Sequence, residues 1–527
     1  MTEINYKEER INDVNKIKDS LHPRKVVVSG PGTGKSYLFS ELIKKKRAEG
    51  KTNFLAITFI GKLSDMLADD LCGLAETMTL HAFAREFVLQ NCRGWTYYPK
   101  MYELIKEDLE NEGIKNFEIG DENYINKTKF YKAIGNDDVV YYAVRICRKN
   151  PNKIPQYDLI LIDEFQDFNS IESDFVDLLA QRSEIIIVGD DDQTLYKFKG
   201  SSPSFLRNKY SQSNDNFESH TLRFCSRCTE VMIKCFHDLI ETYGLNDPQL
   251  GRIQKEFICY LPDKNEDSKR NSKIQILKNC PTGKIAFEIK KELTRLVQSQ
   301  KIKDVLIIGE GRSCESILKQ IGEQLSNYGF RNVDYKKKID YFSINQDIVD
   351  AYKLIHYNPS SPLGWRILGN PEDSKQRNKH IKNAETLDRI INSTSSKLTS
   401  IRDQAISELE TVIEDESIND FEIRKGLLFK LLKRNNIHLS RPLCNLDISV
   451  CNILNSKGLG ADVVFLVGFD NKRFPLKETP NEEEVYQMLV AMTRAKKRIY
   501  LINTIGKNMS SFIDYLDKQY LGIREIT

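Results

Sequence analysis

The sequence predicts an α/β protein with two cores of parallel strands, each interrupted by a helical insertion. Three observations support this fold class. Short runs of apolar residues, such as LILI at 159–162, end in polar or glycine-bearing turns, as buried strands of a doubly wound sheet do. Residues 25–43 have the pattern strand, glycine-rich turn, helix, which opens an α/β nucleotide-binding fold. The same alternation returns after residue 273, which indicates the second core.

The first core is expected to contain four buried strands. They are residues 25–29, 54–58, 159–162 and 185–188. Between residues 86 and 150 the sequence becomes helical, charged and rich in tyrosine, which indicates an insertion. We therefore predict a first domain formed by residues 1–85 and 151–215, with a helical insertion at 86–150.

The second core begins near residue 216. Its expected elements are a strand at 273–277, a helix at 284–298 and a strand at 304–308, and it resumes with DVVFLVGFD and RIYLI. A charge-rich stretch with a polar run at 393–400 interrupts it. We predict a second domain formed by residues 216–370 and 447–527, with a helical insertion at 371–446.

Composition sets broad limits. The chain has 527 residues, of which 40% are hydrophobic and 29% charged, so it is neither disordered nor collagen-like. It lacks the roughly 20-residue apolar run of a membrane helix and an N-terminal signal pattern, so a cytoplasmic location is expected. The net charge of +3 requires any basic groove to be local.

Eleven scattered cysteines are typical of reduced thiols. Cys225 and Cys228 form a CxxC pair, but no second pair at metal spacing follows, and structural zinc needs four ligands.

A phosphate-binding loop follows the first strand. Its glycines allow backbone N–H groups to face phosphate oxygens at a helix N-terminus. Lys35 would contact the β- and γ-phosphates and Ser36 would hold Mg²⁺. The alternative is an ordinary glycine-rich turn that binds no phosphate. The candidate residues are Ser29, Gly30, Pro31, Gly32, Thr33, Gly34, Lys35 and Ser36.

Two adjacent carboxylates end the strand at 159–162. Asp163 lies on the ligand side of an open α/β sheet and would hold Mg²⁺ with Ser36. Glu164 would orient or deprotonate the attacking water. A DE pair in isolation is more often a solvated turn.

A third strand ends at the cluster GDDDQ. Gln193 would sense the γ-phosphate or polarise the water. Tyr196 and Phe198 follow, flanked by Lys197 and Lys199, a pattern that suits bases stacked on rings and phosphates paired with lysines. The alternative is that these rings fill the core beneath a loop.

These motifs, in this order, resemble the UvrD/Rep/PcrA-like branch of superfamily 1 DNA helicases. The matching segments run from about residue 25 to residue 502 and cover both cores but neither insertion. They are GPGTGKS, AITFIGKLSDML, TLHAFAREFV, LILIDEFQD, IIIVGDDDQTLYKFKG, LRFCSRC, NSKGLGADVVFLVGFDNKRFP and MLVAMTRAKKRIYL.

The resemblance implies two RecA-like domains with ATP bound between them. Lys35, Ser36, Asp163 and Glu164 keep the roles given above, and Gln193 becomes the γ-phosphate sensor. Arg227 and Arg494 would act as arginine fingers from the second domain. Without the resemblance both would be interpreted as surface arginines.

The resemblance also implies contacts with single-stranded DNA. The residues concerned are Phe59, Thr79, His81, Tyr196 and Phe198. His81 would otherwise be interpreted as a helix-start or core histidine.

Several positions depart from the family pattern. Ser226 replaces the tyrosine that stacks on adenine, Gly460 replaces the glutamate that meets the ribose, and Gly61 replaces a strand-contacting asparagine. Asn452 and Leu454 replace a threonine and a histidine, and the N-terminal glutamine is not evident. We therefore expect hydrolysis to be kept, with weakened adenine selectivity and processivity.

The leading hypothesis is an ATP-dependent DNA helicase or translocase that moves 3′-to-5′ on single-stranded or partly duplex DNA. The alternative is a nucleotide-dependent DNA-sensing switch that regulates a partner protein, such as a nuclease in anti-phage defence, without processive unwinding. A small-molecule P-loop kinase is disfavoured by chain length and by the distant Arg227 and Arg494.

Overall fold

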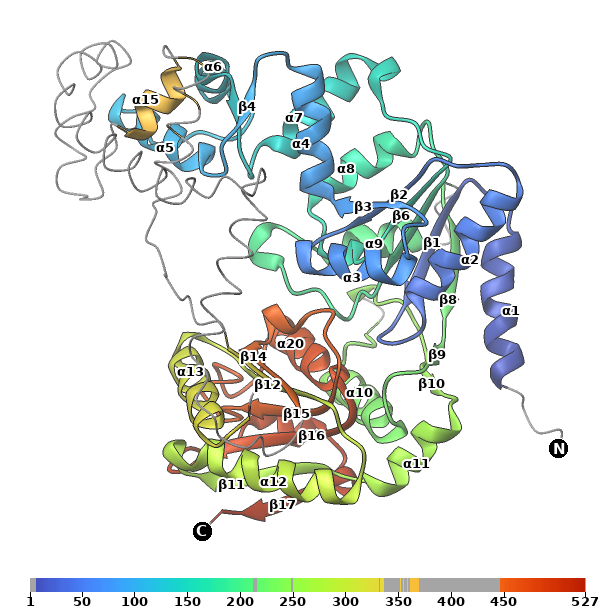
Figure 1. The fold of residues 1–527 in the computed structure, drawn as a ribbon, viewed down its shortest axis with the longest axis vertical. Coiled ribbons are helices and arrows are strands. Elements are labelled where there is room, and N and C mark those ends of the chain that lie inside the picture. Colours follow the sequence, from blue (N-terminus) through green and yellow to red (C-terminus); the bar gives the residue numbers. More distant parts are fainter. Residues whose placement is uncertain are drawn as a thin grey trace, which may run out of the picture. The chain divides into compact units, whose positions relative to one another are not determined.

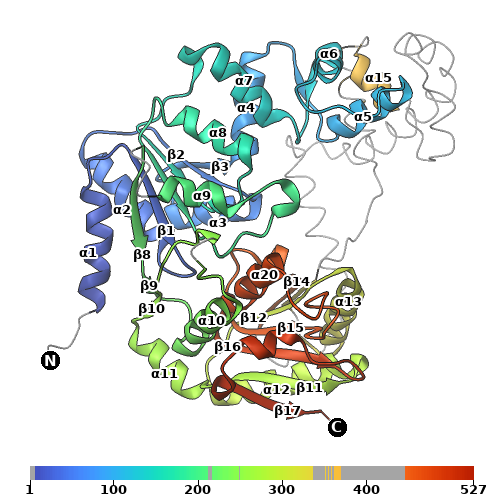
Figure 2. The same ribbon diagram turned by 180° about the vertical axis from the view of Figure 1, so that it is seen from behind.

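The computed structural model describes residues 6–211, 216–247, 250–330, 332–335, 351, 354, 358, 361–368 and 446–526. The chain divides into two compact units, each considered by itself (Figures 1 and 2). The first unit comprises Met1–Leu80, Asn152–Lys337 and Arg441–Thr527, and the second His81–Pro151 and Lys338–Ser440.

The first unit contains a six-stranded sheet in the order β3-β2-β6-β7-β1-β8, and every pair of neighbours is parallel. Its strands are β1 (Arg24–Ser29), β2 (Phe54–Thr58), β3 (Glu76–Thr79), β6 (Leu159–Ile162), β7 (Ile185–Gly189) and β8 (Glu218–Leu222). Because all of them run in the same direction, their carboxyl ends lie at one edge of the sheet.

Helices cover this sheet. One face packs on α1 (Tyr6–Asp19), α2 (Lys35–Ala48) and α3 (Gly61–Leu71), whose apolar side chains share a core with alternate residues of β1, β6 and β7. Helix α9 (Pro203–Tyr210) packs against β1 and β8, and α8 (Ser170–Leu179) follows β6 in the chain. Full burial of the central strands explains their continuous Val, Ile and Leu runs.

A second sheet of seven strands lies in the same unit, in the order β13-β14-β12-β15-β16-β11-β17, again with parallel neighbours. The strands are β11 (Ile274–Cys280), β12 (Asp304–Gly309), β13 (Asn332–Tyr335), β14 (Asp447–Asn452), β15 (Ala461–Val467), β16 (Ala495–Thr504) and β17 (Leu521–Glu525). A separate two-stranded pair joins β9 (Phe224–Cys225) to β10 (Ile258–Cys259).

The two faces of the second sheet bury alternate residues. Val463 and Phe465 pack with α12 (Ile285–Ser299) and α13 (Arg312–Asn327), whereas Val464 and Leu466 pack with α10 (Glu230–Tyr243) and α20 (Glu482–Thr493). Helix α11 (Pro262–Arg270) contacts α10 and β16. Figure 1 shows this layered order of helix, sheet and helix.

The second unit is helical in its described part. Its elements are α4 (Leu80–Asn91), which begins at the boundary, β4 (Thr96–Tyr97), α5 (Met101–Asn111), α6 (Glu122–Tyr131), β5 (Ala133–Ile134), α7 (Val139–Lys149) and α15 (Pro362–Leu368). Residues of α5, α6 and α15 share one apolar core, although α15 follows the others by more than 200 positions in the sequence.

The predicted fold class is confirmed, since the chain is α/β with two parallel sheets. The strand at β8, which the sequence analysis did not identify, lies beyond residue 215 and pairs with β1, so the first sheet extends past that position. The predicted insertion at 371–446 lies outside the described residues except for Leu446. None of the described helices has the length and apolarity needed to cross a bilayer.

A buried ion pair ties α15 to α5. Arg366 is 2% exposed, and its Nε donates to Asp108 Oδ1 at 2.9 Å while Nη2 donates to Glu107 Oε2 at 3.2 Å. Tyr131 also donates to Asp108. Because both charges are out of water, loss of one partner leaves the other uncompensated.

Asp108→Ala should therefore lower the free energy of unfolding of the second unit by about 3–5 kcal/mol. Urea unfolding followed by tryptophan fluorescence measures it, because Trp95 and Trp365 are the two tryptophans of the chain and both lie in this unit. The control is Glu107→Ala, whose carboxylate is 25% exposed. Equal effects of the two variants would contradict a buried pair centred on Asp108.

Candidate nucleotide-binding site

The glycine-rich loop joins the end of β1 to α2. Gly32 and Gly34 have φ values of +68° and +94°, which favour glycine. Thr33 Oγ1 donates to Gly30 O at 2.9 Å and lies 2.6 Å from Ser29 Oγ, so side chains within the loop hold its shape. The loop is preorganised to present N–H groups at the start of a helix, where an anion is favoured.

Lys35 joins this loop to the carboxylates after β6. Its Nζ lies 2.7 Å from Glu164 Oε1 and 3.6 Å from Asp163 Oδ1. Burial alone would lower the pKa of Lys35, but Glu164 and Asp163 outweigh burial and raise that pKa above its ordinary value. The lysine is therefore a fixed cation at the carboxyl edge of the sheet.

The two carboxylates differ in electrostatic environment. Burial would raise the pKa of Glu164, but Lys35 and Lys457 hold it well below its usual range. Burial raises the pKa of Asp163, which Lys35 only partly offsets. Glu164 also has φ +54°, a strained value for a residue other than glycine and one often found at functional sites.

Residues of the chain beyond β8 cover the glycine-rich loop. Ser226 N and Oγ both donate to Gly32 O, each at 2.8 Å. A Cβ added to Gly32 would collide with Arg227 Cβ, and one added to Gly30 would collide with the Phe257 ring. Glycine is required at both positions because the covering segments approach so closely.

The two predicted arginines both lie near the phosphate-binding loop or its partners. Arg227 lies against Gly32, as described above. Arg494, between α20 and β16, is 2% exposed, and its Nη2 donates to Gln193 Oε1 at 3.0 Å. Burial, reinforced by Arg227, lowers the pKa of Arg494 to about 10. A residue of the second sheet's domain thus contacts the predicted sensor at the end of β7.

Lys457 is a site residue that the sequence analysis did not single out. Its Nζ contacts Asp167, lies 3.5 Å from Glu164 Oε2 and donates to Gln193 O at 3.0 Å. In the sequence analysis, the segment NSKGLG served only as part of the resemblance to a family, and its lysine was given no role. Gln166 was also missed; its Nε2 donates to Glu164 Oε2 at 2.7 Å.

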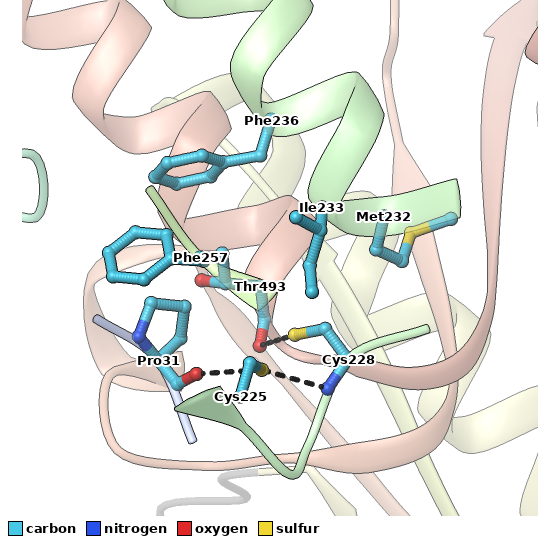
Figure 3. A pocket seen from close by; sticks show the side chains of 8 residues that line it. All are labelled: Pro31, Cys225, Cys228, Met232, Ile233, Phe236, Phe257 and Thr493. Atoms are coloured by element: carbon cyan, nitrogen blue, oxygen red, sulfur yellow. Dashed lines mark hydrogen bonds between the residues drawn. The ribbon is translucent and has the colours of Figure 1, made fainter. Parts of the chain in front are cut away.

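The CxxC pair lines a small apolar pocket beside the loop (Figure 3). Cys225 Sγ lies 3.1 Å from Pro31 O, and Cys228 Sγ lies 3.8 Å from Thr493 O. Among the residues that the structure describes, no further metal-ligating side chains gather with these thiols. The pair packs between the loop and the end of α20, and the zinc interpretation lacks support.

Three of the predicted DNA contacts lie together. The Phe59 and Tyr196 rings are 4.7 Å apart, and those of Tyr196 and Phe198 are 5.9 Å apart. Phe198 is 66% exposed, whereas Tyr196 is 7% exposed. The interpretation as core packing therefore suits Tyr196, and Phe198 alone presents a broad free face. Thr79 ends β3 and His81 lies in the first turn of α4.

The residues present fit a nucleoside triphosphate with its metal ion. The glycine cradle and Lys35 suit phosphate oxygens. Ser36 and Asp163 offer hydroxyl and carboxylate oxygens, the ligands that Mg²⁺ prefers. Glu164 and Gln193 are joined to each other through Lys457, which contacts both.

In comparisons with known proteins, the chain is similar to DNA helicases. The family model of the UvrD/REP helicase N-terminal domain matches residues 100–214. The "Probable DNA helicase II homolog" of Mycoplasma genitalium is 21% identical over 95% of this chain and 86% of its own length. "ATP-dependent DNA helicase Rep" of Buchnera aphidicola is 24% identical over 77% of this chain and 73% of its own length.

A larger relative matches in part. The "Exonuclease/helicase subunit RexA" of Lactococcus lactis is 26% identical over 41% of this chain. The match spans only 20% of that protein.

Gly32→Ala should weaken nucleotide binding by about 10-fold or more, because a strained φ costs about 1–3 kcal/mol and the new methyl group collides with Arg227. Titration with a fluorescent ATP analogue measures the change. Gly50→Ala is the matched control, since Gly50 has φ +82° but nothing within 4 Å of the added carbon. Equal affinities for the two variants would contradict the geometry of the loop.

Proposed function

We propose that this chain, a UvrD/Rep-like member of helicase superfamily 1, hydrolyses ATP to move 3′-to-5′ along single-stranded DNA, including the strand of a partly duplex substrate. The observation that carries the proposal is the hydrogen bond from Arg494 to Gln193. It joins the chain after α20 to the end of β7, beside Lys35 and Glu164. Phosphate chemistry in the first domain is thereby coupled to the position of the second.

The first step of the proposed mechanism is exchange of partners at Lys35. In the structure Lys35 neutralises Glu164. A bound triphosphate attracts Lys35 to its β- and γ-phosphates, and Ser36 and Asp163 would hold Mg²⁺, which neutralises developing charge. With Lys35 withdrawn, the pKa of Glu164 rises toward its ordinary range. Glu164 then becomes a stronger acceptor for the proton of the attacking water.

The second step is stabilisation of the transition state by arginines. Arg494 and Arg227 supply positive charge only when the covering segments are in place. Hydrolysis therefore depends on docking of the second domain, and release of products lets the domains separate. Repeated docking and release against a bound strand would move the chain along it.

Adenine recognition is proposed to be weak. Ser226 occupies the position where the family pattern has tyrosine, and both its N–H and its hydroxyl are committed to Gly32 O. It offers no ring on which a purine can stack. Specificity would then rest on the phosphates, with GTP accepted nearly as well as ATP.

The alternative proposal is a DNA-sensing switch that hydrolyses ATP without unwinding and regulates a partner protein. Leu454, at the position where the family pattern has histidine, packs against the apolar core, which favours this alternative over processive unwinding. A strand-displacement assay separates the two, because robust unwinding excludes the switch. We propose a cytoplasmic location, which is compatible with both the helicase and the switch.

Lys35→Ala should lower the kcat of ATP hydrolysis by about 10²-fold or more, because it removes the cation aimed at the phosphates. Phosphate release is measured with and without single-stranded DNA, and with GTP in parallel. Lys44→Ala is the control on the same helix, since that side chain is 59% exposed and pairs with Glu41. Turnover by the unmodified protein that is indifferent to both DNA and RNA would refute the motor.

Phe198→Ala should weaken binding of single-stranded DNA by about 1–3 kcal/mol, the cost of one lost base–aromatic stack. Fluorescence anisotropy of a labelled oligonucleotide measures it. Phe287→Ala, on α12, removes a ring that is 48% exposed and serves as the control. If both variants bind DNA as the unmodified chain does, Phe198 is not a stacking residue.

A further inference from the structure

Three consecutive aspartates after β7 are wholly buried. The side chains of Asp190, Asp191 and Asp192 are each 0% exposed, and their carboxylate oxygens lie within 4.8 Å of one another. Burial raises the pKa of Asp190, as expected for a carboxyl group among like charges. Such a cluster is stable only with positive charge at its centre, supplied by a metal ion or by side chains.

Side chains supply that charge. Lys255 Nζ is also 0% exposed and contacts all three carboxylates, at 2.9 Å from Asp190 Oδ1 and 2.9 Å from Asp192 Oδ2. Since the ammonium group takes the centre of the cluster, the aspartates are not a metal site.

Two arginines complete the neutralisation of the three aspartates. Arg252 Nε and Nη2 make a bidentate pair with Asp192, both at 2.8 Å. Arg207 Nε donates to Asp191 Oδ2 at 2.8 Å. Three cations therefore match three carboxylates.

Lys255 and Arg252 belong to a segment, residues 252–257, that also covers the phosphate-binding loop. Phe257, two residues after Lys255, lies against Gly30 and belongs to the apolar core beside α10 and α20. The backbone N–H of Ile253 donates to Asp191 Oδ2 at 3.0 Å. The segment thus holds the end of β7 and the end of β1 at once.

The cluster is connected to the sensor through Asp190. Gln193 Nε2 donates to Asp190 Oδ2 at 2.5 Å, and the other end of the same amide, Oε1, accepts from Arg494. Asp190 thereby fixes which way the amide of Gln193 points. The backbone N–H of Asp190 also donates to Gln166 Oε1 at 3.0 Å, and Gln166 donates to Glu164.

We propose that Lys255 is a positioning residue for ATP hydrolysis: it holds Asp190 so that the Gln193 amide is oriented toward Arg494. The inference rests on the proposed ATPase function. Lys255 does not touch the phosphates; it acts through Asp190 on the sensor. Its loss therefore affects the chemical step more than nucleotide binding.

The test compares Lys255→Met with the unmodified protein in steady-state ATP hydrolysis with single-stranded DNA. The expected kcat falls by about 10²-fold, the effect of a misplaced catalytic group, while KM for ATP stays within about 3-fold. Lys25→Met is the matched control, because Lys25 is 1% exposed and paired with Glu184, but at the opposite end of β1 from the loop. It should leave kcat unchanged.

A double-mutant cycle separates positioning from a merely structural role. If Lys255 acts through Gln193, adding Lys255→Met to Gln193→Ala costs little further activity. Asp190→Asn keeps the shape and leaves one acceptor oxygen, which Lys255 and the backbone N–H of Asp192 require, so an NH2 group would face Gln193 Nε2 in place of an acceptor. This variant should show the same loss of kcat, and it replaces Lys255→Met if that variant does not fold. Lys255→Arg, which restores the charge, should recover part of the loss.

Two results overturn the inference. One is an unchanged kcat in Lys255→Met, or in Asp190→Asn where that variant replaces it. The other is an equal loss of kcat with and without Gln193, since the lysine would then act on the fold rather than the sensor. An unmodified protein without ATP turnover would refute the proposed function itself, and this inference with it.

Discussion

The parallel pairing of β6, β7 and β1 is the constraint on which the rest of the structure depends. Because these strands run in the same direction, the glycine-rich loop, the Asp163–Glu164 pair and Gln193 emerge at one edge of one sheet. A shift of register by one residue would turn each polar side chain to another face of the sheet.

That geometry concentrates carboxylates, so buried cations must accompany it. Lys35 and Lys457 hold Glu164 ionised, and Lys255 lies among the three aspartates. Lys457 and Lys255 come from the chain beyond β8. Removal of either would leave carboxylates buried without compensation, which costs more than the pair itself contributes. The carboxylates at the edge of the first sheet are therefore neutralised by cations from a later part of the chain, and the loss of either lysine would be costly.

Local patterns were sufficient to predict the central strands and the position of the glycine-rich loop. Segment 159–162 is uniformly apolar and segment 54–58 is apolar up to its last residue, Thr58, which is typical of strands buried on both faces. Strand β8, with the sequence ESHTL, was missed because it lies at an edge and is only half-buried. Lys255 and Lys457 carry no local signal either. A lysine in a loop is usually solvated, and only the folded chain brings these two to their carboxylates.

The surroundings of the aromatic residue Tyr196 also could not be predicted from the sequence. Its spacing with Phe198 and the neighbouring lysines suits a stacking platform, and sequence cannot tell which ring faces outward. In the structure the backbone turns at η3 (Lys197–Lys199), so the Tyr196 ring packs on Phe59 while Phe198 remains exposed. Gln193, which contacts Arg494 and Lys457, therefore lies three residues before a buried ring and five residues before an exposed one. A short turn is enough to give two neighbouring aromatic residues opposite surroundings, and sequence spacing alone does not show which of them is buried.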